Sequence, residues 1–211
     1  MSEFLRSLGK VKRKGEPTDL LVIGLGNPGS EFAGTRHNVG ADVVDELVER
    51  HGTRLRKTKS RALAAGIVLH GRRVVVAFPQ TFMNNSGEAV RSLARSYGVR
   101  EPQHIVVIHD ELDLEPGRLR LKVGGGLAGH NGLRSITQHL GSTDYLRLRI
   151  GIGRPPGSQT GANYVLRAPG KADREILRVA ISSAADAIER LVTDGADATM
   201  SVVNRRAPGD G

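Results

Sequence analysis

His37 stands in a glycine-flanked stretch, residues 34–40 (GTRHNVG), between an apolar run and an amphipathic helical pattern. A neutral imidazole can take a proton from water near neutral pH, which is the work of a general base. Asp110 follows a second apolar run, residues 105–108, after one intervening histidine. Because a carboxylate behind an imidazole fixes its tautomer and stabilises its protonated form, we expect Asp110 to orient His37.

Three asparagines occupy similar loop positions. Asn27, Asn84 and Asn131 each have glycine or serine close by. A carboxamide can donate and accept hydrogen bonds without changing the charge of a site. We therefore expect these side chains to hold a carbonyl, an ester oxygen or the water that His37 activates. The alternative is ordinary turn chemistry, in which asparagine is also favoured.

A serine nucleophile is one alternative to a base acting on water. Ser86 and Ser135 do not stand in the G-x-S-x-G pattern of a nucleophile elbow. Ser86 precedes a helical pattern and is predicted to be its N-cap. We therefore expect water to be the nucleophile.

A metal site is the second alternative, with four possible ligands: His37, His109, Asp110 and His130. No pair of these histidines has the H-x-x-x-H spacing that places two ligands on one helix face. His109 and Asp110 are neighbours on an extended chain, so their side chains should point to opposite faces. We expect neither a metal ion nor another cofactor.

The charge of the chain indicates a polyanionic partner. Lys and Arg number 31 against 22 Asp and Glu, a formal net charge of +9, and residues 54–61 hold five basic residues and no acidic one. Aromatic residues make up only 3% and tryptophan is absent, so a stacking platform for several bases is not expected. Such a chain should bind phosphates more than bases.

Composition also limits the location. There is no cysteine, and no run approaches the roughly 20 apolar residues that span a bilayer. Residues 1–18 lack the apolar segment and cleavage site of a signal peptide. We expect a cytoplasmic protein without membrane association.

Alternating patterns predict one α/β domain at residues 19–195, with a twisted, mixed, mainly parallel sheet flanked by helices. A disordered basic tail is expected at 1–18 and a C-terminal tail at 196–211. The predicted strands are 20–23, 62–69, 74–78, 105–108, 118–122 and 145–152, and the last helix is 171–193.

Residues 24–29 (GLGNPG) match the dinucleotide fingerprint G-x-G-x-x-G. That loop should open directly into a helix whose N-terminus holds the pyrophosphate. Here a polar stretch separates it from the next helical pattern, which starts near Asn38. We interpret the glycines as letting the backbone approach a ligand, with Asn27 directed into the site. A nucleotide-dependent enzyme is the alternative.

Six segments together resemble the bacterial peptidyl-tRNA hydrolase family over about residues 20–193. They are 24–29 (GLGNPG), 35–38 (TRHN), 81–84 (TFMN), 109–114 (HDELDL), 129–133 (GHNGL) and 149–153 (RIGIG). The resemblance implies cleavage of the ester that joins a peptide to the 3′ end of tRNA, which recycles tRNA from abandoned translation. It also implies a monomer whose partner is peptidyl-tRNA.

The resemblance assigns roles by motif position. His37 is the base, Asp110 its orienting partner, and Asn27, Asn84 and Asn131 position the peptide, the water or the terminal adenosine.

In the same way Phe82 lines the site, and Lys122 and Arg149 clamp the 5′-phosphate of tRNA. Phe32 stands where the family usually has tyrosine, so that hydroxyl is missing. A non-catalytic RNA-binding relative, like the chloroplast intron-splicing factor similar to this family, is the other alternative; the presence of His37 and Asp110 argues against it.

Overall fold

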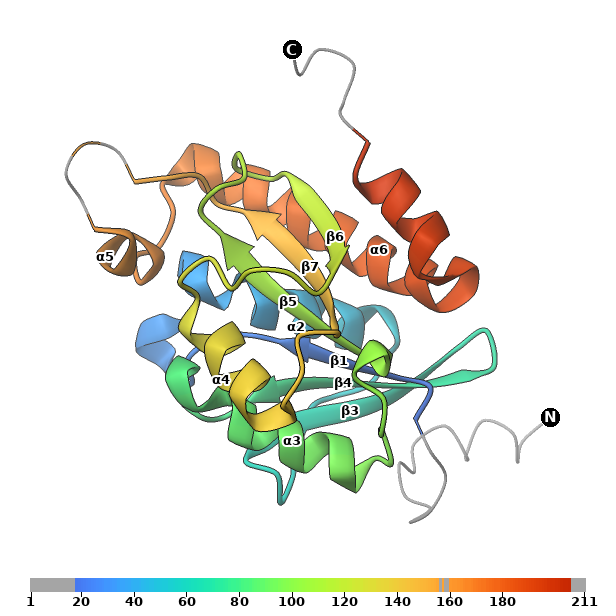
Figure 1. Ribbon diagram of the computed structural model, residues 1–211. Coiled ribbons are helices and arrows are strands. Elements are labelled where there is room, and N and C mark those ends of the chain that lie inside the picture. The colour runs from blue at the N-terminus through green and yellow to red at the C-terminus, as the bar shows by residue number, and fades with distance from the viewer. Residues whose placement is uncertain (1–17, 156, 158–159, 206–211) are drawn as a thin grey trace.

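A seven-stranded sheet in the order β2-β3-β4-β1-β5-β7-β6 forms the centre of the molecule (Figure 1). The structure is a computed structural model that describes residues 18–155, 157 and 160–205, so the tail expected at 1–18 lies almost wholly outside the described residues. The strands are β1 Leu20–Gly24, β2 Arg56–Lys57, β3 Ala62–Leu69, β4 Arg72–Pro79, β5 Ile105–Glu111, β6 Leu119–Val123 and β7 Leu146–Gly151.

The helices are α2 Val39–Arg50, α3 Ser86–Ser96, α4 Asn131–Leu140, α5 Gly161–Val165 and α6 Lys171–Val203. Within the described residues, four 3-10 turns join the elements: η1 Ser30–Phe32, η2 Arg36–Asn38, η3 Met83–Asn85 and η4 Pro102–His104. None of the helices in the described part of the chain has both the length and the apolar character needed to cross a bilayer.

The four central strands, β4-β1-β5-β7, are parallel, and antiparallel pairs complete both edges of the sheet. Parallel strands covered on both faces read as continuous apolar runs, as in the LLVIG of β1, which is buried throughout. The predicted single α/β domain with a mixed sheet is confirmed.

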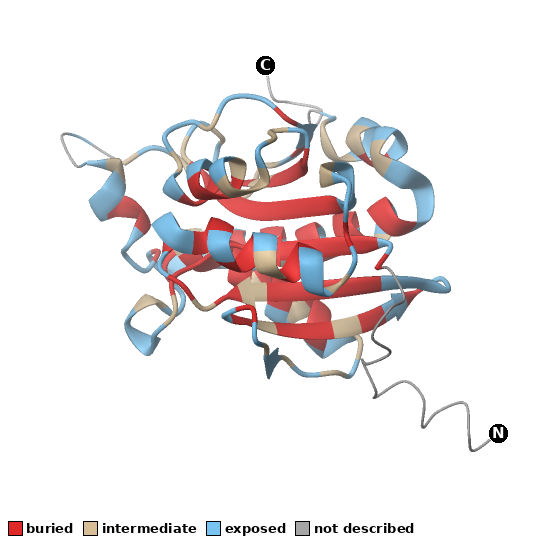
Figure 2. Ribbon diagram, turned by 60° about the horizontal axis from the view of Figure 1, so that its bottom comes forward, coloured by how far each residue is buried: buried red, intermediate tan, exposed pale blue. Residues whose placement is uncertain are grey.

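Two apolar layers hold the sheet between helices. Leu20 and Val22 of β1 belong to the cluster under α2 and α6, whereas Leu21 and Ile23 belong to the cluster under α3 and α4. Successive strand side chains alternate between the two faces, so one run serves both cores. Figure 2 shows the buried strands between helices whose outer sides are exposed.

Gly24, the first glycine of the 24–29 motif, serves helix packing. A Cβ on Gly24 would collide with the carbonyl oxygen of Gly40, and a Cβ on Gly40 would collide with that of Ile108. The expectation that these glycines admit a ligand therefore needs correction at Gly24, which lets α2 lie directly against β1 and β5. Two 3-10 turns precede α2, so no helix opens from the motif itself.

The C-terminal helix extends beyond the predicted end at residue 193. Gly195 interrupts α6 with φ 81° and ψ 176°, but helical residues continue to Val203 and Thr199 is buried. Asn204 then pairs with the edge strand β6, accepting from Leu121 N and donating to Leu121 O, both at 2.9 Å. In this way the side-chain amide of Asn204 takes the place of a further strand at the edge of the sheet. The helical periodicity of the sequence gives no sign of this contact.

Candidate active site

His37 and Asp110 meet at the carboxyl end of the parallel strands. The turn η2 carries His37 and β5 carries Asp110, and His37 Nδ1 lies 2.8 Å from Asp110 Oδ1. The two side chains are 12% and 3% exposed. Ligands bind at this edge in open α/β sheets, and the predicted pairing of the two residues is present.

His130 is a third member of the site. Its Nε2 lies 3.1 Å from the same Oδ1 of Asp110, and its ring centroid lies 5.1 Å from that of His37. From its sequence position alone, His130 is a candidate only as a metal ligand. The available signal was its position before the helical pattern of α4, because His130 is the N-cap of that helix.

The N-cap of α4 fixes the proton positions. His130 Nδ1 accepts from the backbone N–H groups of Gly132 and Leu133, at 3.1 and 3.3 Å. A nitrogen that accepts carries no proton, so we assign the His130 proton to Nε2, which donates to Asp110. Asp110 Oδ1 accepts from His37 in the same way, which places that proton on Nδ1. In the neutral ring Nε2 of His37 is then the nitrogen that can accept a proton, and it has no hydrogen-bond partner among the described residues.

Asp110 is held in its charged form. Burial on its own would raise the pKa of this carboxyl, but the hydrogen bonds from His130 and His37 outweigh it and keep the pKa well below the usual value. The adjacent His109 behaves in the opposite way, because burial, with His130 nearby, lowers its pKa to about 3. A charged carboxylate therefore stands next to a His109 ring that stays neutral at neutral pH.

The His37, Asp110 and His130 ligand atoms lie within 4.8 Å of one another, close enough to suggest a metal site. A metal ion would need the lone pair of His130 Nε2, which would move the ring proton to Nδ1. Nδ1 already accepts two backbone N–H groups, so coordination would break the cap of α4. This donor set favours hydrogen-bonded imidazoles over metal ligation.

Asn27 joins three loops beneath the site. It is buried, its Oδ1 accepts from Met83 N at 2.8 Å, and its backbone N–H donates to Asn38 Oδ1 at 2.9 Å. Asn38 returns a bond from Nδ2 to Asn27 O at 2.9 Å. These bonds occupy the carboxamide oxygen of Asn27 and leave its NH2 group without a partner among the residues described.

Four further predicted residues are exposed or partly exposed: Phe32, Phe82, Asn84 and Asn131. Asn84 in η3 and Asn131 at the start of α4 are exposed, and Arg134 donates to Asn131 Oδ1 at 3.5 Å. Phe32 and Phe82 lie edge to face with ring centroids 6.5 Å apart, and Phe82 is 60% exposed. This pair of apolar rings is a candidate contact surface for a ligand.

Lys122 and Arg149 line one cavity of about 290 Å³ beside the site, together with His109, Glu111 and Arg147. The two cations are diagonal neighbours, because Lys122 pairs in register with Arg147 and Arg120 with Arg149. Arg147 is buried and binds the carbonyls of Gly125 and Gly126 at 2.9 and 2.7 Å. Arg147 thus holds the glycine-rich loop, and Lys122 and Arg149 are the two cations of the cavity that do not bind these carbonyls.

Comparisons with known proteins agree with this arrangement. A family model described as peptidyl-tRNA hydrolase matches residues 21–209. The chain belongs to the peptidyl-tRNA hydrolase family. A peptidyl-tRNA hydrolase of Frankia alni is 50% identical over 188 residues, covering 88% of this chain and 95% of that protein. The crystal structure of peptidyl-tRNA hydrolase from Acinetobacter baumannii is 36% identical, with a TM-score of 0.84, and covers 92% of this chain and all of that one.

In this member of the peptidyl-tRNA hydrolase family both candidate serines are structural. Ser86 Oγ donates to Met83 O at 2.8 Å, and Ser135 Oγ accepts from Gly87 N at 2.9 Å. Both serines are buried. The predicted N-cap role of Ser86 is wrong, because the cap residue of α3 is Asn85 and Ser86 is already helical. These bonds leave His37 as the better placed reactive group.

Proposed function

We propose that this chain hydrolyses the ester between a peptide and the 3′ end of tRNA, with water as the nucleophile and His37 as the general base. The observation that carries the proposal is the hydrogen bond from His37 Nδ1 to Asp110, which leaves Nε2 as a proton acceptor at the open side of the site. Membership of the family supports the substrate.

The reaction is a proton transfer coupled to acyl transfer. Nε2 takes one proton from water, and the water oxygen bonds to the ester carbonyl carbon. The bond between that carbon and the ribose 3′-oxygen then breaks, and the imidazolium returns its proton to the leaving oxygen. Asp110 stabilises the imidazolium between the two transfers. The products are tRNA with a free 3′-hydroxyl and the peptide carboxylic acid.

An alkoxide leaving group explains why so few groups suffice. A ribose oxygen leaves far more readily than an amide nitrogen, so hydrolysis needs a base, a held water and donors for the developing oxyanion. We assign the unpartnered NH2 group of Asn27 to the water or the oxyanion. Exposed Asn84 and Asn131, with Phe32 and Phe82, are assigned to the peptide and the terminal adenosine.

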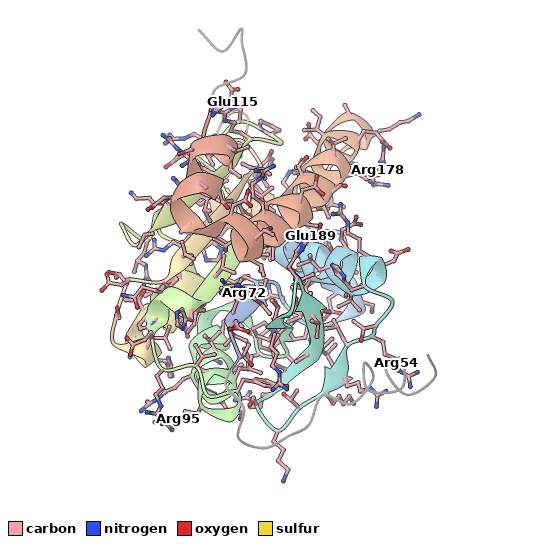
Figure 3. All side chains as sticks on the ribbon, turned by 90° about the vertical axis from the view of Figure 1, so that its right-hand side faces the viewer. Arg54, Arg72, Arg95, Glu115, Arg178 and Glu189 are labelled. Carbon is pink, nitrogen blue, oxygen red and sulfur yellow. The ribbon has the colours of Figure 1, made fainter. Side chains whose placement is uncertain are left out.

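We assign Lys122 and Arg149 to the 5′-phosphate of tRNA. Both line one cavity beside the site, and the net charge of +9 suits a polyanion. Positive charge is also spread over the rest of the surface, since exposed Arg54, Arg95 and Arg178 lie in different regions in Figure 3. The proposal includes action as a monomer in the cytoplasm.

A hydrolysis assay tests the proposal. Purified protein is incubated with N-acetylated aminoacyl-tRNA as a minimal peptidyl-tRNA, with the free aminoacyl-tRNA as the matched control. We expect release of the acyl group from the first substrate at catalytic protein concentrations and much slower release from the second. Tight tRNA binding without release would contradict the proposal and favour a non-catalytic RNA-binding protein.

A further inference from the structure

Glu111 is the last residue of β5 and forms a two-pronged ion pair with Arg149 of β7. Its Oε2 accepts from Arg149 Nε at 3.0 Å and from Nη2 at 2.8 Å. The carboxylate side chain is only 4% exposed, and Oε1 accepts from Asp113 N at 3.2 Å. Both oxygens are therefore engaged, and the carboxylate cannot easily change its position.

The surroundings of this pair are strongly cationic. Arg120 is opposite Arg149 across the β6–β7 pair, and Lys122 is opposite Arg147. Like charges directly opposite one another on a sheet repel. Glu111 supplies the one carboxylate among the residues described around the cavity that contains Lys122 and Arg149. Without it, the neighbouring cations would drive the flexible Arg149 side chain away toward solvent.

The ion pair leaves part of the guanidinium free. A guanidinium has five N–H groups, and Glu111 occupies the edge formed by Nε and Nη2. Nη1 has no hydrogen-bond partner among the residues that the structure describes. We propose that Glu111 is a positioning residue, which fixes Arg149 so that its free edge binds the 5′-phosphate together with Lys122. This inference rests on the proposed function of that cavity.

Competition between carboxylate and phosphate is the opposing effect. If Glu111 and the phosphate needed the same guanidinium edge, Glu111 would weaken phosphate binding. The observed contacts use one edge and leave the other, and a planar guanidinium can bind two oxyanions at once. Because Glu111 already holds the Arg149 side chain in one rotamer, little further side-chain entropy is lost when the phosphate binds, which favours binding. Positioning should therefore outweigh competition.

The test compares peptidyl-tRNA with and without its 5′-phosphate. We expect the wild-type KM to rise at least about tenfold when the phosphate is removed, as a charge-assisted hydrogen bond implies. In Glu111→Gln this ratio should fall to about threefold or less, with kcat little changed. Glu46→Gln is the matched control, because Glu46 pairs with Arg50 at 2.8 Å on α2. It should keep the wild-type ratio.

A second variant covers the case in which Glu111→Gln folds poorly. The double variant Glu111→Gln, Arg149→Gln removes both charges of this partly buried pair. Its ratio of KM values without and with the 5′-phosphate should be no larger than that of Arg149→Gln alone. An unchanged or larger phosphate effect in Glu111→Gln would overturn the positioning role. If removal of the 5′-phosphate changes KM neither in wild type nor in Arg149→Gln, Lys122 and Arg149 do not bind that phosphate. This result would contradict the proposed function of the cavity and is distinct from failure of the positioning role.

Discussion

His130 donates to Asp110 through Nε2, 3.1 Å from Oδ1, the same oxygen that accepts from His37. The cap of α4 fixes the proton on His130 Nε2, so Oδ1 must face this ring as an acceptor. The orientation of the Asp110 carboxylate is thus set by a helix N-terminus, and the carboxylate in turn sets the tautomer of the base.

Asp110→Asn should reduce kcat less than His37→Ala, which removes the base. His130 requires an acceptor, so the asparagine should turn its oxygen toward both imidazoles and preserve the tautomer of His37. Because the neutral amide stabilises the imidazolium of His37 less than a carboxylate does, we expect kcat to fall about tenfold to a hundredfold. Turnover of Asp110→Asn measured beside His37→Ala decides this. If Asp110→Asn is the more damaging change, Asp110 is the base.

Asn27 variants should separate structure from chemistry. Asn27→Ala leaves Met83 N buried without its acceptor, which should cost about 1 to 3 kcal/mol of unfolding free energy. Asn27→Asp keeps that acceptor but replaces the NH2 donor by a negative oxygen, so kcat should fall at least as far as in Asn27→Ala.

Denaturant unfolding and turnover of both Asn27 variants provide the measurement. The matched Ala variants of exposed Asn84 and Asn131 should leave stability near wild type. An Asn27→Asp variant with full activity would show that Asn27 only shapes the turn.

The Lys122→Ala, Arg149→Ala double variant should bind tRNA more weakly and with a flatter salt dependence. Loss of one phosphate contact should reduce the slope of log K against log salt by about one, with little change in saturated turnover. Arg54→Ala with Arg56→Ala removes the same charge from the opposite edge of the sheet and is the control. An equal reduction by the control would mean that the effect is general charge and that no clamp exists.

Asp42, in the first turn of α2, should make stability depend on pH. Burial, with a smaller contribution from Asp45, raises its pKa from 3.8 to about 6. A raised pKa means that this group favours the folded state below about pH 4 and that the benefit is lost as pH rises through 6. The shift sets an upper limit of about 3 kcal/mol, and the helix N-terminus offsets about 0.3 to 1 kcal/mol of it.

Asp42→Asn should therefore stabilise the protein by about 1 to 2 kcal/mol at pH 8 and by almost nothing at pH 4. Thermal unfolding at the two pH values measures this, with Asp197→Asn on the exposed side of α6 as control. A gain that is equal at both pH values would show that the effect does not come from titration of Asp42.

Local patterns were enough to predict the central fold and the His37–Asp110 pair. The runs at 20–23 and 105–108 are apolar throughout because β1 and β5 pack helices on both faces. Residues that follow parallel strands gather at one edge, so Asp110 could be placed near His37.

Features that depend on long-range geometry were beyond the sequence. The bond from His130 to Asp110 requires α4 to begin at one particular residue, and helix ends are poorly defined by periodicity. The ion pair of Glu111 with Arg149 depends on the register of β5 against β7. The resemblance assigns Arg149 to a phosphate clamp, whereas the fold also ties one edge of its guanidinium to the buried carboxylate of Glu111.

The central claim is that His37 removes the proton from water, and turnover of His37→Ala with saturating peptidyl-tRNA tests it most directly. Exposed His104→Ala is the control, and thermal unfolding of both variants shows whether the fold is retained. We expect kcat to fall by about two to four powers of ten in His37→Ala, while its affinity for tRNA stays at the wild-type value. The His104→Ala control should keep wild-type turnover. A folded His37→Ala protein that releases peptide at nearly the wild-type rate would contradict the account.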